Sequence, residues 1–62
     1  MKIKYKGDNK SKWSNDLTEG KDYFLKECLV DGVFIYGTLM DDINKEVVIS
    51  SHRMKHFNIV DQ

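Results

Sequence analysis

The sequence predicts a small all-β protein, and three observations support this class. Several short runs alternate apolar with polar residues at a period of two, which is typical of half-buried strands. The chain has four glycines and no proline, so glycine, Asn and Asp are expected to form the turns between these runs. No segment carries a helical period over more than about two turns. These patterns together predict five short strands in one domain that spans residues 1–62.

The first predicted strand covers residues 2–6, where lysines alternate with apolar side chains. A mostly polar segment follows at residues 7–20 and is predicted to be a long loop. Loops of this length without structure of their own are uncommon, and they tend to be functional or to be packed by a few side chains. Trp13 and Leu17 are the large apolar residues of this loop, so they are its expected anchors.

The second and third strands are predicted over residues 22–30 and 33–41. Between them, Asp31-Gly32 is a strong hairpin signal, because both central positions of such a turn favour a positive φ. Gly37 lies in the middle of the third strand and predicts a bulge there. Both strands carry apolar residues on both faces, which suits strands that bend across a small barrel.

The rest of the chain is predicted to form a tight turn, a strand, one helical turn and a final strand. Asn44 is expected to take the left-handed conformation in the turn over residues 41–45. Ser50 or Ser51 is expected to cap the helical turn. The last two predicted strands cover residues 46–50 and 57–60.

Composition excludes several classes of protein. With a single cysteine, Cys28, the chain has no intramolecular disulfide, which fits a reducing cytosolic setting. Cys28 lies in an apolar run and is expected to be a small buried hydrophobe rather than a reactive thiol. No apolar run approaches the ~18 residues of a membrane span, and no leader-like run follows Met1. We therefore expect a cytoplasmic protein that does not contact the membrane.

The order of the predicted elements resembles the plan of an SH3-like barrel. One segment is more specific, because Leu17-Thr18-Glu19-Gly20-Lys21-Asp22-Tyr23 matches a Leu-Thr-x-Gly-Lys-x-Tyr segment. That segment is found in very small SH3-like proteins of phages and prophages of Gram-positive bacteria. The resemblance covers roughly residues 1–60, and it departs from the family at Asn44-Lys45, where many relatives have glycine.

This resemblance implies an SH3-like small barrel of five short antiparallel strands, with one helical turn before the last strand. It also implies a phage or prophage origin and the bacterial host cytosol as the location. Members of the family are mostly uncharacterised, so the resemblance implies a fold and an origin rather than a reaction.

No motif in the sequence predicts an enzyme, a cofactor or a metal site. His52 and His56 lie four residues apart, but a third ligand is missing nearby. Asp41-Asp42 is interpreted as a turn rather than as a pair of catalytic carboxylates. The chain also lacks a P-loop, a glycine-rich phosphate cradle and a nucleophile motif. A non-enzymatic protein without cofactor or metal is therefore expected.

Binding of another protein is the first functional expectation, through the long loop and the flanking strand faces. Without proline, and with Val33-Phe34 at the start of the third strand, the chain lacks the aromatic groove that grips proline-rich peptides. Trp13 is expected either to pack the loop onto the barrel or to stand out as a contact, and packing is the favoured hypothesis. The candidate contact residues are Trp13, Tyr5, Tyr36 and Leu17.

Nucleic-acid binding is the alternative expectation. The formal net charge is zero, but residues 1–12 hold five lysines and one acid, whereas residues 13–46 hold three lysines and eight acids. First and last strands lie side by side in an SH3-like barrel, so the basic ends could form one surface. The candidate residues are Lys2, Lys4, Lys6, Lys12, Arg53 and Lys55.

Two considerations weigh against this alternative and favour a protein partner. Lysines that alternate along an edge strand are the usual protection against unwanted strand pairing. Acids also crowd the middle of the chain, where Lys21 is expected to be solvated without a partner. So small a core with an open sheet edge leaves homodimerisation open.

Overall fold

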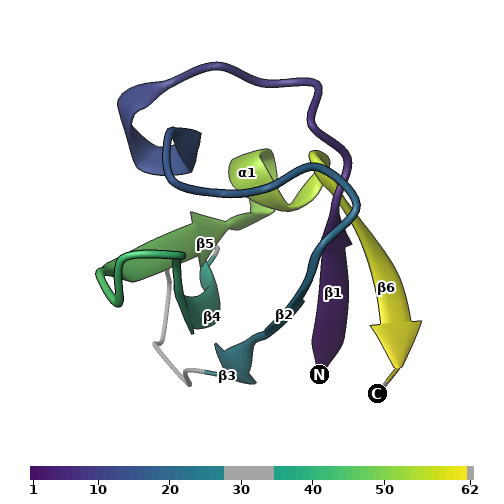
Figure 1. Ribbon diagram of the computed structural model, residues 1–62. Coiled ribbons are helices and arrows are strands. Elements are labelled where there is room, and N and C mark those ends of the chain that lie inside the picture. Colours follow the sequence, from purple (N-terminus) through teal and green to yellow (C-terminus); the bar gives the residue numbers. More distant parts are fainter. Residues whose placement is uncertain (28–34, 62) are drawn as a thin grey trace.

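The computed structural model describes residues 1–27 and 35–61, which form two three-stranded antiparallel sheets (Figure 1). The first sheet has the order β2-β1-β6 and the second has the order β3-β4-β5. The strands are β1 (Lys2–Tyr5), β2 (Asp22–Phe24), β3 (Lys26–Glu27), β4 (Ile35–Met40), β5 (Glu46–Ser50) and β6 (Phe57–Asp61). The helical elements are the 3-10 helix η1 (Lys12–Ser14) and the helix α1 (Ser51–Met54). The all-β class is therefore confirmed.

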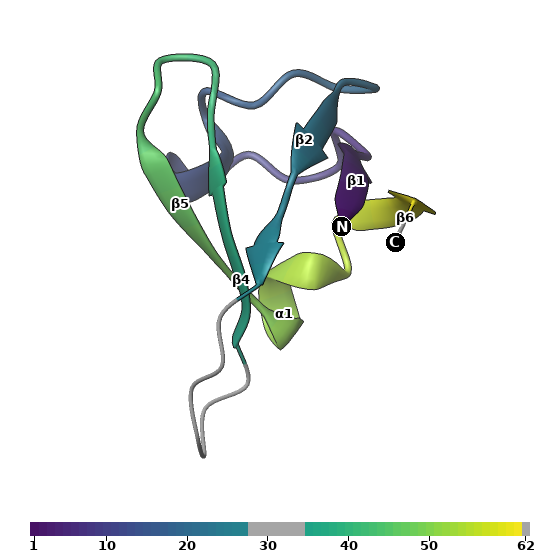
Figure 2. The ribbon, with the colours of Figure 1, turned by 90° about the horizontal axis from the view of Figure 1, so that it is seen from below.

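β1 is the central strand of the first sheet and pairs with β2 on one side and β6 on the other. Ile3 lies opposite Tyr23 of β2 and opposite Ile59 of β6. Figure 2 shows β4 and β5 on one side of the molecule, β1 and β6 on the other side, and β2 between them. This arrangement places the two ends of the described chain on neighbouring strands of one sheet.

The segment β2–β3 contributes to both sheets. A single strand was expected over residues 22–30, but the strand is interrupted at Leu25, whose N–H donates to the carbonyl of Met1 at 2.7 Å. β2 then pairs with β1, whereas β3 pairs with β4. Among the described residues the two sheets stay separate and do not close into one barrel, so the closed five-stranded barrel stays a prediction.

One hydrophobic core lies between the two sheets. Ile3 of the first sheet and Ile49 of the second are fully buried, and Tyr5 and Val47 are buried beside them on the same inward faces. Side chains alternate between the two faces of a strand, which explains why the residues between them are exposed. The buried core residues are Ile3, Tyr5, Tyr23, Leu25, Leu39, Val47, Ile49, Met54 and Phe57.

Three local predictions are confirmed within the described residues. Asn44 has φ 60°, which is the left-handed conformation expected in the turn between β4 and β5. The ladder between β4 and β5 is irregular between Ile35 and Gly37, where a bulge was expected. Ser50 caps α1, because its Oγ accepts the N–H of Arg53 at 3.2 Å. Cys28 and the Asp31-Gly32 turn lie outside the described residues.

Candidate interaction surfaces

Trp13 holds the middle of the long loop, residues 7–20, against the two sheets. Trp13 belongs to η1, whose segment of the chain lies at the upper left in Figure 1. Its ring is half-buried, with centroid distances of 6.2 Å to Phe57 and 5.9 Å to His56. The guanidinium carbon of Arg53 lies 4.9 Å from the centroid of the Trp13 ring, within range of a cation–π contact. Trp13 therefore packs the loop onto the molecule, as the favoured hypothesis expected.

Two polar contacts hold the beginning of the loop. Asp8 Oδ1 lies 2.8 Å from His56 Nδ1, and this hydrogen bond lowers the pKa of the Asp8 carboxyl. The hydroxyl of Tyr5 donates to the backbone carbonyl of Asn9. Tyr5 was predicted as a contact for a partner, but it is 3% exposed and belongs to the core. Its hydroxyl reaches the beginning of the loop, and its backbone carbonyl accepts the N–H of Gly20 at the end of the loop at 2.8 Å.

Asp42 holds the end of the loop to the turn between β4 and β5. Its carboxylate accepts hydrogen bonds from Thr18 Oγ1 at 2.6 Å, Lys21 Nζ at 2.5 Å and Tyr23 Oη at 3.0 Å. The Lys21 ammonium and the Thr18 hydroxyl lower the pKa of Asp42 to about 2, and the same carboxylate raises the pKa of Lys21. Lys21 was expected to be solvated, and the structure corrects this expectation.

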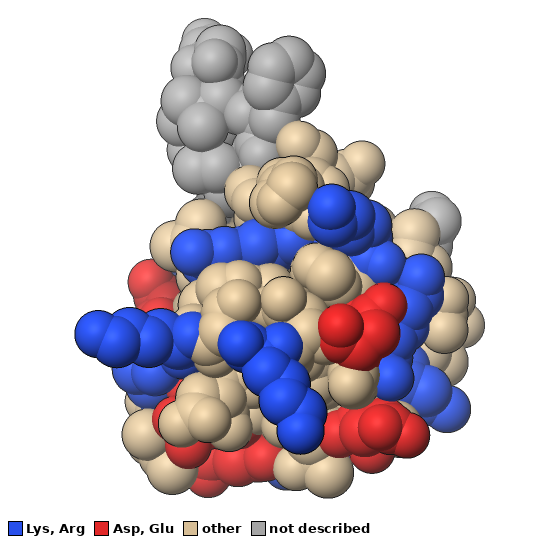
Figure 3. All heavy atoms as spheres, turned by 90° about the horizontal axis from the view of Figure 1, so that it is seen from above, with Lys and Arg blue, Asp and Glu red and all other residues tan. Residues whose placement is uncertain are grey.

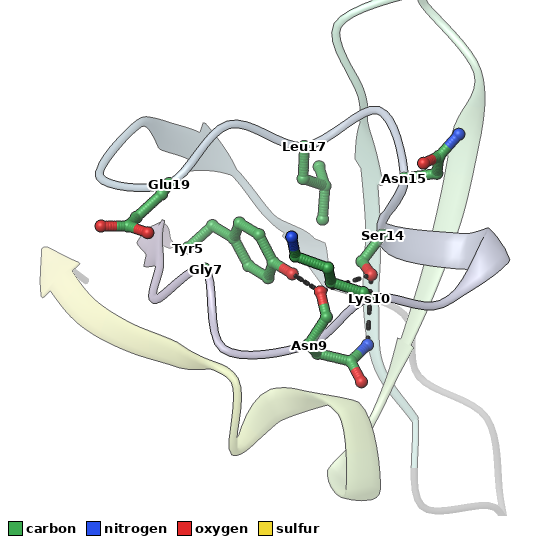
Figure 4. Close-up of a pocket in the computed structure, with 8 residues that line it drawn as sticks. All are labelled: Tyr5, Gly7, Asn9, Lys10, Ser14, Asn15, Leu17 and Glu19. Carbon is green, nitrogen blue, oxygen red and sulfur yellow. Dashed lines mark hydrogen bonds between the residues drawn. The ribbon is translucent and has the colours of Figure 1, made fainter.

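A hollow of about 330 Å³ lies under the loop (Figure 4). Several of its polar groups are already paired with each other, since Asn9 Nδ2 donates to Ser14 Oγ at 3.1 Å. Leu17, one of the predicted contact residues, is half-buried, packs against the core and lines this hollow. Its lining residues are Tyr5, Gly7, Asn9, Lys10, Ser14, Asn15, Leu17 and Glu19.

β4 and β5 carry three exposed apolar side chains, which we call the outer patch and define as Tyr36, Met40 and Val48. Their exposed fractions are 46%, 51% and 42%, respectively. Val48 lies opposite Thr38, which stands between Tyr36 and Met40 along β4. Tyr36 was predicted as a contact residue from the sequence, whereas Met40 and Val48 were not. The period-two alternation around buried Leu39 and Val47 could have indicated both of them.

Charged residues border the outer patch on both sides. Glu46 lies opposite Met40 on β5, and Lys26 lies opposite Thr38 on β3. Both side chains are exposed. An apolar centre with a charged rim is the usual composition of a protein–protein interface.

The basic ends of the chain do meet, although some of their side chains are engaged. β1 and β6 are neighbours, and Lys6 Nζ donates to the carbonyl of Lys55 at 2.9 Å. Lys4 Nζ lies 3.9 Å from Asp22 Oδ1. Lys2 is exposed on β1, and Lys12 is exposed on η1.

Arg53 does not extend this basic strand surface. In addition to its contact with Trp13, its Nη1 donates to the carbonyl of Val48 at 2.9 Å. Figure 3 looks down on the long loop and shows lysine and arginine side chains interspersed with acidic ones. Positive charge on this face is therefore divided rather than continuous.

The two histidines have different surroundings. His52 is exposed on α1, whereas His56 contacts Asp8. Over residues 1–27 and 35–61, no group of three or more His, Cys, Asp or Glu side chains could hold a metal ion.

The described part of the chain contains no helix with the length and apolarity needed to cross a membrane.

Comparison with known proteins leaves the chain without a match. No family model, no curated protein and no solved structure matches its sequence or its fold.

Proposed function

We propose that this chain is a non-enzymatic protein-binding module with an SH3-like fold, of the phage or prophage type, that acts in the bacterial cytosol. The fold proposal is supported by the order of the elements along the chain. β1 is followed by a long loop, β2 continues into β3, β4 and β5 share a tight turn, and α1 precedes β6. The Leu17–Tyr23 segment supports the resemblance to small phage proteins.

The outer patch is the observation that carries the proposed function. Tyr36, Met40 and Val48 are exposed although their strands belong to a well-packed sheet. Tyrosine and methionine are enriched in the centres of protein interfaces, and lysine and glutamate are depleted there. An apolar centre bordered by Glu46 and Lys26 is consequently suited to a folded protein partner.

Affinity capture from a bacterial host lysate with the double variant Tyr36→Ser/Met40→Ser tests the proposal. We expect the wild-type chain to retain a specific protein, and the variant to retain it at least about tenfold less, as loss of an interface centre does. Retention should change little with salt, because apolar contacts dominate. Ile43→Ser is the matched control, since Ile43 is 64% exposed and lies in the turn outside the patch. Equal retention by wild type and the patch variant would contradict the proposal.

Nucleic-acid binding is the second candidate, and the pairing of β1 with β6 is the observation that favours it. This pairing brings Lys6 to Lys55, and Lys4 and Lys2 follow along the neighbouring strand. Binding to single-stranded DNA or RNA should then weaken steeply with salt, because counterions are released from the phosphates. Replacing Lys2, Lys4 and Lys6 with glutamine should reduce both the affinity and the salt slope. A titration without a salt-dependent shift would exclude this candidate.

A further inference from the structure

We propose that two copies of this chain associate through antiparallel pairing of their β6 strands, which joins their first sheets into one continuous sheet. β6 is an edge strand in the described structure, because it pairs with β1 on one side only. This interface lies on the first sheet and is independent of the outer patch on the second.

The backbone of β6 presents to this edge groups that have no hydrogen-bond partner among residues 1–27 and 35–61. Lys6 donates its N–H to the carbonyl of His56 at 2.9 Å, which fixes the alternation of the antiparallel ladder. It follows that the N–H and C=O groups of Phe57 and Ile59 point away from β1. An edge strand with such groups is a template for another strand.

The side chains of β6 do not protect this edge. Proteins usually protect an edge strand with lysine, proline or a covering element. Asn58, Ile59 and Val60 are uncharged, and the two apolar residues are 51% and 47% exposed. One edge strand of the other sheet, β5, differs, because α1 packs against β5 and Arg53 binds the carbonyl of Val48.

The charges along β6 favour a second copy in the antiparallel direction. Lys55 precedes the strand and Asp61 ends it. A two-fold axis at Asn58 places each Ile59 opposite the partner's Phe57. It also brings each Lys55, which lies in the turn just before the strand, toward the end of β6 that carries the partner's Asp61. The ladder between β1 and β6 shifts its register between Lys2 and Ile3, so the regular pairing centres on residues 57–59. Parallel pairing would instead bring like charges together.

Two lysines of the same chain lie beside these charges. Lys2 lies opposite Asp61 in the sheet, and Lys6 Nζ binds the Lys55 carbonyl rather than its ammonium. His56 contacts Asp8. The Lys55 side chain is exposed and can reach across the new edge.

Sedimentation equilibrium of the full chain over micromolar to millimolar concentrations tests the association. We expect a concentration-dependent dimer for the wild type and an association constant at least about tenfold lower for Asn58→Lys, because two lysines then meet on the axis. Ile43→Lys, which places the same charge on an exposed site outside β6, should leave the association unchanged. A wild type that stays monomeric at millimolar concentration, or a dimer unaffected by Asn58→Lys, would overturn the proposal.

Charge reversal tests the register. Lys55→Glu and Asp61→Lys should each weaken the dimer by roughly tenfold, because each creates two like-charged pairs across the axis. The double variant Lys55→Glu/Asp61→Lys should restore association to near the wild-type value. A double variant that associates no better than the single variants would contradict a two-fold axis at Asn58.

Amide hydrogen exchange provides a readout that needs no variant. Protection of the Phe57 and Ile59 amides should rise with protein concentration, while the Asn58 amide, which faces β1, should be protected throughout. Unprotected Phe57 and Ile59 amides at concentrations where dimer is present would show that another surface forms it, and would overturn the proposal.

Discussion

Asp41 and Asp42 are neighbours in the turn between β4 and β5, but their carboxylates bind different parts of the chain. Asp41 is buried, and its Oδ1 accepts the N–H groups of Ile43 at 3.1 Å and Lys45 at 2.8 Å. These bonds shape the turn itself. Asp42 points to the long loop and accepts from Thr18, Lys21 and Tyr23. One aspartate therefore forms the turn and the other docks the loop on it.

The pKa of Asp42 makes its contribution dependent on pH. Its folded-state pKa is about 2, against an ordinary value of 3.8, so the carboxylate stabilises the folded state above pH 3.8. That stabilisation is lost as the pH falls from 3.8 toward 2. We expect Asp42→Asn to unfold at lower urea concentration than wild type at pH 6, with a difference that narrows by pH 2.5. Urea denaturation at pH 6, 4 and 2.5 measures this difference.

Asp22→Asn is the control for this pH profile, because Asp22 has a single lysine contact at 3.9 Å. Asp8 also has a lowered pKa, but it is present in every protein of the series, so its effect cancels in the comparison. A gap between wild type and Asp42→Asn that stays constant from pH 6 to pH 2.5 would argue against the charged network.

The long loop is an ordered element that is attached at both ends and in the middle. Its two glycines, Gly7 and Gly20, have φ values of +77° and +78°, which are unfavourable for residues with a Cβ. Their surroundings differ. A Cβ at Gly7 would lie 2.5 Å from Glu19 Cγ, whereas a Cβ at Gly20 would meet nothing within 4 Å.

These two glycines form a matched pair of substitutions. Gly20→Ala should lower the free energy of unfolding by about 1 kcal/mol, through backbone strain alone. Gly7→Ala should lower the free energy of unfolding by about 1–2 kcal/mol more than Gly20→Ala does, because the Glu19 side chain must also move. Urea denaturation of both variants measures the difference. Equal destabilisation by the two variants would mean that the Glu19 side chain moves away from residue 7 without any loss of stability.

At the scale of the whole molecule, both sheets depend on one core. Ile3 and Ile49 are each 0% exposed and come from different sheets, and they belong to the same buried cluster. For a chain of this length, total stability is of the order of 3–9 kcal/mol. Neither sheet is therefore expected to remain folded without the other.

This shared core predicts a single unfolding transition. Ile3→Val and Ile49→Val should each lower the free energy of unfolding by about 1 kcal/mol, as loss of one buried methylene does. Far-UV circular dichroism and the fluorescence of the single tryptophan, Trp13, should report the same midpoint for each protein. Ile43→Val, at a 64% exposed position, should leave the midpoint unchanged. Two separate midpoints would show that the sheets unfold independently.

The sequence by itself determined the features that depend on a residue and its close neighbours in the chain. The alternation in residues 2–5 predicted a strand with Ile3 inside. The left-handed Asn44 and the cap at Ser50 were predictable because their conformations are set by local backbone preferences and by short hydrogen bonds. The all-β class followed from the same local signals.

Only the tertiary structure decided which distant residues meet. Lys21 binds Asp42 across 21 positions of sequence, and His56 meets Asp8 across 48. The break at Leu25 and the burial of Tyr5 likewise depend on where the two sheets pack against each other. No period or propensity encodes such contacts, because their geometry arises only when the separate strands share one core. The two surfaces proposed for partners are the outer patch and the β6 edge, and both were likewise decided by the tertiary structure.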